Sequence, residues 1–252
     1  QLTFLVKRVL HISDCHLVAP GQTLLETDTE ATLVSVLEAA FAEIDAARCD
    51  AIIASGDLAH LATEAVYRRF HSLITQFFNG PLLCLPGNHD VLSAMQAAGL
   101  PMQSIVWPDW QLAALDSHED DKPKSLITEI DRQALSQAVA GTQSRHILLA
   151  THHPLVEVHC PWLDRDRIVG PLELLNWLNQ QSGERLRGVV FGHTHQEVEA
   201  KVGCWPVFGV PSTCFQFQPQ SSRFALDDLA PGYQWLELQH DGEITRTVRR
   251  VN

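Results

Sequence analysis

Gly188-Val189-Val190-Phe191-Gly192-His193-Thr194-His195 is an apolar run that ends directly in two histidines on either side of a threonine. Four further apolar runs also end in residues that can bind a metal ion. Residues 9–13 precede Asp14 and His16, residues 51–55 precede Asp57, residues 82–86 precede Asn88, His89 and Asp90, and residues 147–151 precede His152 and His153. Continuous apolar runs are typical of buried strands, and open α/β sheets bind ligands at the carboxyl ends of their strands. The sequence therefore predicts a metal site along one edge of an α/β sheet.

The segments around these runs alternate between strand and helix patterns. Apolar residues at helical spacing follow a predicted capping box at Thr27 and Glu30, and the same spacing recurs over residues 66–77. Further helices are expected near 92–98, 129–140 and 171–180, and further strands near 4–12, 104–107, 110–115, 146–151 and 187–191. The remaining chain has the pattern of short strands near 197–201, 205–210, 214–217, 222–226, 233–239 and 243–251. We expect one domain over residues 1–252, with two facing sheets and outer helices.

The composition excludes several classes of partner. The net charge is −12, from 18 basic and 30 acidic residues, and a polymeric nucleic acid would need clustered Lys and Arg to contact its phosphates. Within the sequence, no stretch reaches the roughly 18 apolar residues that a membrane helix needs, so no membrane partner is expected. The six cysteines include no pair with CxxC spacing, a pattern that suits a reducing compartment. We therefore expect a cytoplasmic protein that acts on a small molecule. The oligomeric state stays open, with a homodimer as one alternative.

The candidate ligands are too numerous for one ion. Seven residues qualify: Asp14, His16, Asp57, Asn88, His152, His193 and His195. Tetrahedral zinc takes four ligands, but if one carboxylate bridges, seven residues supply four ligands to each of two divalent ions. Asp14 and His16 are two residues apart, as are His193 and His195. An extended backbone would turn both side chains of each pair to the same side. Mixed imidazole, carboxylate and amide ligands favour iron or manganese, with zinc as an alternative. Two such ions can bind a phosphate and activate water.

Five motifs in this order carry a family resemblance. Asp14-Cys15-His16, Gly56-Asp57, Gly87-Asn88-His89-Asp90, His152-His153-Pro154 and Gly192-His193-Thr194-His195 resemble the motifs of the calcineurin-like metallophosphoesterases. The resemblance implies a four-layer α/β/β/α sandwich of two mixed sheets flanked by helices, with a dinuclear metal centre. It assigns Asp14, His16, Asp57 and His195 to the first ion. It assigns Asp57, Asn88, His152 and His193 to the second ion.

The same resemblance implies the catalytic and substrate-binding residues. His89 would contact the phosphate, and Asn88 and His195 would also bind the substrate. Asp90 would cap the following helix and hold the ring of His89, with a mere helix cap as the alternative. His152 and His153 compete for one ligand position, and the motif favours His152.

Four more segments narrow the resemblance. LETDTE (25–30), PWLD (161–164), PSTCFQF (211–217) and LDDLAPGY (226–233) are similar to segments of the bacterial class III 3′,5′-cyclic-AMP phosphodiesterases. This resemblance implies hydrolysis of cyclic AMP to 5′-AMP by attack of a hydroxide that bridges the two ions. Cys15 departs from the family, which more often has threonine there. The alternatives are a broad phosphodiesterase or nucleotidase acting on other small phosphate esters, and a non-catalytic binding scaffold. The complete ligand set argues against the scaffold.

Three further features have two interpretations each. His60 follows the turn at Asp57, so it either lies on the surface or lines the pocket. Trp162 and Phe217 either stack on a nucleobase, as aromatic side chains do in other nucleotide sites, or pack within the protein. The charged residues 164–167 are expected to form a solvated loop whose charges pair with one another.

Overall fold

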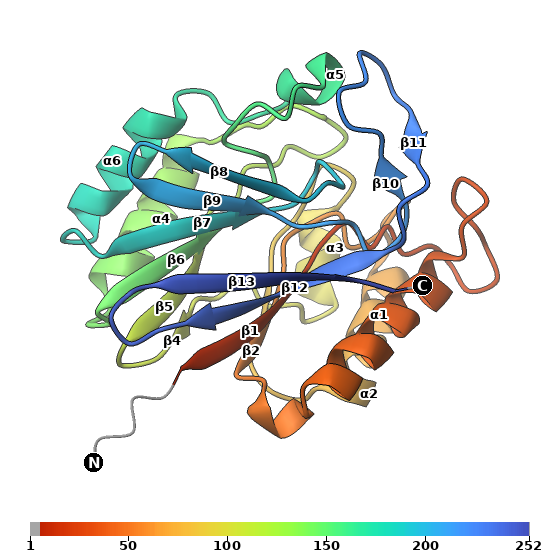
Figure 1. The fold of residues 1–252 in the computed structure, drawn as a ribbon, viewed down its shortest axis with the longest axis horizontal. Coiled ribbons are helices and arrows are strands. Elements are labelled where there is room, and N and C mark those ends of the chain that lie inside the picture. The colour runs from red at the N-terminus through yellow and green to blue at the C-terminus, as the bar shows by residue number, and fades with distance from the viewer. Residues whose placement is uncertain (1–5, 252) are drawn as a thin grey trace.

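Two mixed β-sheets packed face to face form the centre of the protein, as the ribbon in Figure 1 shows. The computed structural model describes residues 6–251. The first sheet has the strand order β13-β12-β1-β2-β3, from β1 (Lys7–Ile12), β2 (Ala51–Ala54), β3 (Leu82–Cys84), β12 (Gly232–Leu238) and β13 (Ile244–Arg250). The second has the order β4-β5-β6-β7-β9-β8, from β4 (Ile105–Val106), β5 (Trp110–Ala114), β6 (His146–Ala150), β7 (Leu186–Phe191), β8 (Val198–Val202) and β9 (Trp205–Gly209).

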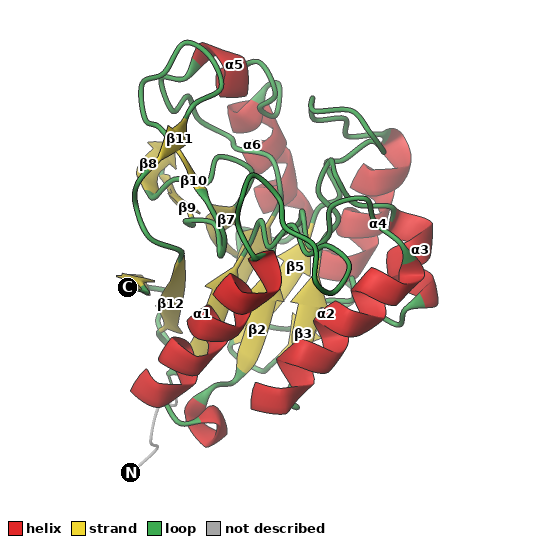
Figure 2. Cartoon of the chain, turned by 90° about the vertical axis from the view of Figure 1, so that its right-hand side faces the viewer, coloured by secondary structure: helices red, strands yellow, loops and turns green. Residues whose placement is uncertain are grey.

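Helices flank the outer faces of both sheets. The helices α1 (Thr29–Glu43), α2 (Glu64–Phe77) and α3 (Leu92–Ala97) pack beside the first sheet, and Figure 2 shows α1 and α2 running across it. The helices α4 (Glu129–Ala140) and α6 (Pro171–Gln181) cover the second sheet. A short helix α5 (Pro161–Asp164), a turn η1 (Ala46–Arg48) and a small pair of strands, β10 (Gln216–Phe217) and β11 (Leu226–Asp227), complete the elements.

Three hydrophobic clusters separate these four layers. In β1, Leu10 and Ile12 pack toward the helices of the first sheet, whereas Val9 packs between the two sheets. Successive side chains of a strand point to opposite faces, so a strand that is apolar throughout can contribute to two clusters at once. The third cluster lies between the second sheet and α4 and α6. The expected α/β/β/α sandwich is therefore confirmed.

The structure corrects three details of the predicted elements. The N-cap of α1 is Asp28, whose Oδ1 accepts a hydrogen bond of 2.9 Å from the backbone N–H of Ala31, so the capping box predicted at Thr27 is wrong by one residue. The strand expected near 222–226 is only Leu226–Asp227. The expectation of one sheet edge is also wrong, since β1, β2 and β3 belong to the first sheet, and β6 and β7 to the second.

The described part of the chain has no helix that is both long enough and apolar enough to span a bilayer.

His11 in β1 should make the stability of the fold depend on pH. Its Nδ1 accepts a hydrogen bond of 2.8 Å from Gln234, its Nε2 lies 2.7 Å from Ser55 Oγ, and burial lowers its pKa from 6.5 to about 3. Between these two pH values the unfolded chain binds one more proton than the folded chain, so stability is full above pH 6.5 and falls as the pH drops. Between pH 7 and pH 5 the parent protein should lose about 2 kcal/mol more than His11→Gln does.

Urea denaturation in the presence of a chelator measures this difference without a contribution from bound metal. An equal loss of stability in both proteins would contradict the neutral, buried state of His11.

Candidate metal centre

The carboxyl ends of β1, β2, β3, β6 and β7 meet where the two sheets face each other. Backbone hydrogen bonds continue the pairing of β1 and β2 into the loops that follow these strands: Asp14 N–H donates to Gly56 O and His16 N–H donates to Asp57 O, both over 2.9 Å. Gly192 N–H donates to His152 O over 3.1 Å, which joins the loops after β6 and β7 in the same way. The loop backbones therefore fix where the candidate ligands stand.

The backbone of five candidate ligands is left-handed. The φ angles are 54° at Asp14, 43° at His16, 50° at Asp57, 65° at His193 and 50° at His195. Residues other than glycine rarely adopt φ values in this range, and each instance costs on the order of 1–3 kcal/mol. The expected extended backbone is therefore wrong, although Asp14 and His16 do reach one ligand group, and His193 and His195 reach two adjoining ones. Such strain persists where surrounding structure holds it, which is common at functional sites.

Two glycines make the close approach of these loops possible. A Cβ atom at Gly87 would collide with the backbone nitrogen and carboxylate of Asp57. A Cβ atom at Gly192 would collide with Ser13 Oγ and come within 2.8 Å of Asp14 Oδ2. A side chain at either position would push Asp57 or Asp14 out of place.

One group of candidate ligands gathers around His16 and His195. Their Nε2 atoms lie 3.1 Å apart, and His195 Nε2 lies 3.5 Å from Asp14 Oδ1. Asp57 Oδ2 is 3.7 Å from His16 Nε2. All four side chains are buried. These are the four residues that the family resemblance assigns to the first ion.

A second group lies on the other side of Asp57. Asn88 Oδ1 is 3.0 Å from His193 Nδ1 and 3.3 Å from His152 Nε2, and these two nitrogen atoms are 3.3 Å apart. His152 Nε2 also lies 3.5 Å from Asp57 Oδ2. The same oxygen of Asp57 thus faces both groups. Its other oxygen, Oδ1, accepts a hydrogen bond of 2.8 Å from the backbone N–H of His89.

The donor set fits divalent cations. Burial lowers the pKa of His16 to about 3 and also lowers the pKa of His193, so both imidazoles are neutral at pH 7. Burial acts in the same direction on His152, but the Asp57 carboxylate outweighs it and raises the pKa of His152 to about 9. Ring nitrogen atoms of four histidines lie 3.1–3.3 Å apart in two pairs beside two buried carboxylates. Imidazole and carboxylate donors gathered in this way form a region that a bound divalent cation would stabilise.

Two candidate ligands are held from behind by backbone carbonyl groups. His152 Nδ1 donates to Ser55 O over 2.8 Å, and His195 Nδ1 donates to Phe215 O over 2.7 Å. Each ring therefore turns its Nε2 atom into the cluster. His153 does not enter it, because its Nδ1 bonds Ser117 Oγ over 2.9 Å and its Nε2 donates to Pro123 O over 3.0 Å.

A cavity of about 170 Å³ opens over the cluster. His89 lines it, and the rings of His60 and His16 lie 4.8 and 5.1 Å from the His89 ring. His60 is half-buried beside these two histidines, so of its two interpretations the structure favours the one at the pocket. The sequence signal for His60 was its position three residues after Asp57.

The expected roles of Asp90 do not match its contacts. Its carboxylate accepts hydrogen bonds from the backbone N–H groups of Gly87 (2.8 Å), Leu58 and Ala59 (both 3.1 Å), and from the Tyr67 hydroxyl (2.7 Å). None of these donors is the ring of His89, and α3 begins without a side-chain cap. Asp90 instead ties the loop after β2 to the loop after β3.

The segment after β6 contributes two charged residues, Arg165 and Asp166, that the sequence did not predict at the site. Trp162, Arg165 and Asp166 line the cavity, and Asp166 is only 3% exposed. The expected solvated position is therefore wrong for this aspartate, although its Oδ1 still pairs with Arg165 Nε of the same loop at 3.8 Å. Asp164 also serves the fold, since its Oδ1 accepts a hydrogen bond of 2.7 Å from Val158 N–H.

Aromatic side chains form another wall of the cavity. The ring of Phe217 stacks on that of His195, with centroids 3.9 Å apart and an angle of 18° between the planes. Trp162 meets Phe217 edge-on at 5.0 Å, and Phe224 meets both rings. Both Trp162 and Phe217 thus line the site and pack against each other.

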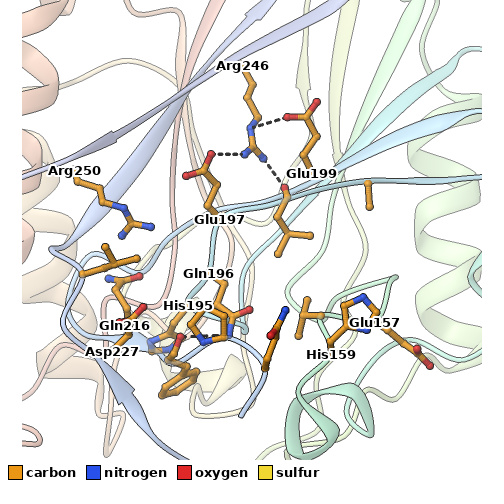
Figure 3. Close-up of a pocket in the computed structure, with 17 residues that line it drawn as sticks. Glu157, His159, His195, Gln196, Glu197, Glu199, Gln216, Asp227, Arg246 and Arg250 are labelled. Atoms are coloured by element: carbon orange, nitrogen blue, oxygen red, sulfur yellow. Dashed lines mark hydrogen bonds and ion pairs between the residues drawn. The ribbon is translucent and has the colours of Figure 1, made fainter.

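A second cavity, of about 600 Å³, lies beyond His195 and Phe217. Figure 3 shows His195 and Gln196 at one end of it and Arg246 at the other. The Arg246 guanidinium is paired with Glu197 at 3.1 Å and Glu199 at 3.9 Å. Its charge is therefore balanced within the protein.

Comparisons with known proteins agree with this geometry. The family model for the calcineurin-like phosphoesterases matches residues 7–197. The 3′,5′-cyclic adenosine monophosphate phosphodiesterase CpdA of Escherichia coli K12 is 35% identical over 251 residues, which cover 97% of this chain and 90% of that protein. CpdA of Pseudomonas aeruginosa is 33% identical over 249 residues, with coverage of 97% and 90%.

Solved structures share the fold at low sequence identity. A dimetal phosphatase from Danio rerio has a TM-score of 0.59 at 11% identity, and the aligned region covers 98% of this chain and 99% of the phosphatase chain. The purple acid phosphatase PPD1 from yellow lupin has a TM-score of 0.64 at 13% identity, with coverage of 99% and 52%. The match over residues 7–197 and the relatives that are 33–35% identical over nearly the whole chain lead to one conclusion: the chain belongs to the calcineurin-like phosphoesterase family and is a hydrolase of phosphate esters.

Proposed function

We propose that this protein hydrolyses 3′,5′-cyclic AMP to 5′-AMP at a dinuclear metal centre. The observation that carries the proposal is the position of Asp57 Oδ2, which lies 3.7 Å from His16 Nε2 in one ligand group and 3.5 Å from His152 Nε2 in the other. One carboxylate oxygen between two groups of ligands is the arrangement that two bridged ions require. The curated relatives named as cyclic-AMP phosphodiesterases support the substrate.

The residues divide into two half-sites under this proposal. The first ion is held by Asp14, His16, Asp57 and His195, and the second by Asp57, Asn88, His152 and His193. Iron or manganese suits these ligands, with zinc as the alternative. When bound, two divalent ions neutralise the charge of a phosphodiester and activate a water molecule for attack on phosphorus.

The protein itself supplies orientation and a proton donor. His89 stands on the cavity wall next to Asn88, and its backbone N–H is fixed by Asp57 Oδ1 at 2.8 Å. From there the imidazole can bond the phosphate and donate a proton to the departing 3′ oxygen. Asn88 and His195 face the same cavity and complete the contacts to the phosphate.

The wall of Trp162 and Phe217 provides a surface for the nucleobase. Every base has an aromatic face, and stacking on such side chains is worth about 1–3 kcal/mol per base. The two aromatic residues lie beside the candidate metal ligands, which suits a compact cyclic nucleotide whose phosphate and base are close together. The proposal includes a small-molecule substrate and, because no cysteine pair has CxxC spacing, a reducing, cytoplasmic location.

A substrate panel tests the proposal. With the protein loaded with Mn²⁺, kcat/KM is measured on cyclic AMP, cyclic GMP, 2′,3′-cyclic AMP and bis-p-nitrophenyl phosphate. We expect cyclic AMP to give the highest value. Equal values across the panel would identify a broad phosphodiesterase, and activity confined to bis-p-nitrophenyl phosphate would rule out the cyclic-nucleotide substrate.

A further inference from the structure

The carboxylate of Asp166 is a buried charge to which neither the fold nor the proposed reaction assigns a role. The residue follows α5 and is held by its own backbone, because Asp166 N–H donates to Leu163 O over 2.9 Å and Ser125 N–H donates to Asp166 O over 3.0 Å. Its side chain is 5% exposed, and its Oδ1 atom has no hydrogen-bond partner and lies 3.8 Å from Nε of Arg165, whose side chain is 64% exposed. An ionised group in such a place is costly unless another polar group faces it.

The buried group that faces the other oxygen of Asp166, Oδ2, is the outer edge of His193. Asp166 Oδ2 lies 3.5 Å from His193 Nε2, which is also buried without a hydrogen-bond partner. The other nitrogen of the same ring, Nδ1, points into the ligand group at 3.0 Å from Asn88 Oδ1. The ring therefore spans the distance between the candidate metal site and the carboxylate.

Two other ligand histidines show what such an arrangement does. His152 and His195 each donate their outer N–H to a backbone carbonyl, at 2.8 and 2.7 Å, and turn the remaining nitrogen inward. A histidine that binds metal usually donates its second ring N–H in this way, which fixes its tautomer and raises its basicity. His193 has no carbonyl partner in this position, and Asp166 stands where one would be.

We propose that Asp166 is the positioning residue of the second metal site. Its carboxylate attracts the single proton of the neutral His193 ring to Nε2, which leaves the lone pair of Nδ1 free for the second ion. A carboxylate is a stronger hydrogen-bond acceptor than a carbonyl oxygen. His193 Nδ1 is therefore a stronger metal ligand than the nitrogen of a histidine whose outer N–H bonds a carbonyl. This inference rests on the proposed dinuclear centre.

Titration of the metal-free protein with Mn²⁺ tests this role without any substrate. The parent protein should bind two ions, and Asp166→Asn should bind the first ion as the parent does and the second about 10- to 100-fold more weakly. At low free Mn²⁺ the electron paramagnetic resonance spectrum of the variant should show an isolated Mn²⁺ ion in place of a coupled pair. Glu157→Gln is the matched control, because it removes a 57% exposed carboxylate from the same segment, and it should behave as the parent.

A double-mutant cycle shows whether Asp166 acts through His193. His193→Ala should itself lose the second ion, and adding Asp166→Asn to it should weaken binding no further, because interacting residues are not additive. Asp166→Ser, which also lacks the charge, should give the same loss and serves if Asp166→Asn does not fold.

Different results of the Mn²⁺ titration would contradict the role of Asp166 and the dinuclear centre itself. Two ions bound with parental affinity by a folded Asp166 variant would overturn the role of Asp166 alone. Equal weakening of both ions would also overturn it, because the carboxylate would then support the whole site. A single ion in the parent protein would instead remove the dinuclear centre itself.

Discussion

Asp57→Asn should deprive the protein of bound metal and lower kcat on the order of 10³-fold or more, because metal ions contribute several kcal/mol to such reactions. Asp57 Oδ2 lies within 3.7 Å of His16 Nε2 and 3.5 Å of His152 Nε2, so one substitution weakens both half-sites. The negative charge of Asp57 is also what raises the pKa of His152 against the effect of burial. Asparagine keeps the size of the side chain but removes this charge.

Elemental analysis after gel filtration and steady-state kinetics measure the two effects in the same samples. Glu38→Gln, which removes an exposed carboxylate from α1, should keep both ions and the parental kcat. If Asp57→Asn retained two ions per chain, the bridging position of this carboxylate would be wrong.

His89→Ala should retain both ions and still lose about 10²- to 10⁴-fold in kcat, the usual contribution of a general acid or base. The variant keeps the backbone N–H that donates to Asp57 Oδ1 over 2.8 Å, so the candidate bridging carboxylate stays in place. Only the imidazole that faces the cavity is removed. The metal content, measured beside kcat on cyclic AMP, therefore separates this effect from that of Asp57→Asn.

His159→Ala is a suitable control, since this exposed histidine lines the neighbouring cavity rather than the metal site. Parental turnover of cyclic AMP by His89→Ala would show that the reaction does not use this side chain.

The positions of the candidate ligands could be predicted from the sequence because they follow apolar strands directly. The end of a buried strand has a fixed place in the sheet. The type of residue that directly follows it therefore indicates which side chains lie together at that edge. Thus Asp14 and His16 gather in one ligand group, whereas His193 and His195 enter the two adjoining groups. The reason given for this spacing was wrong, because these residues are left-handed rather than extended. For residues other than glycine, the local sequence does not indicate a left-handed backbone.

Other features depend on contacts between distant segments. The surface of α5 and the segment after it look polar in sequence, yet tertiary packing buries Asp166 against His193, 27 residues further along the chain. Asp90 likewise bonds Tyr67 and the loop after β2, which local spacing does not indicate. The five strands that precede the candidate ligands are divided between two sheets by long-range pairing. The local sequence of each strand does not indicate to which sheet it belongs.

The central claim is that bound metal enables this protein to open a cyclic nucleotide. The most direct test incubates cyclic AMP with the metal-free and the Mn²⁺-loaded protein in water enriched in ¹⁸O and analyses the product by mass spectrometry. We expect 5′-AMP with one ¹⁸O atom in its phosphate, formed only by the loaded protein. Unchanged cyclic AMP in the presence of protein that holds two Mn²⁺ ions per chain would contradict it.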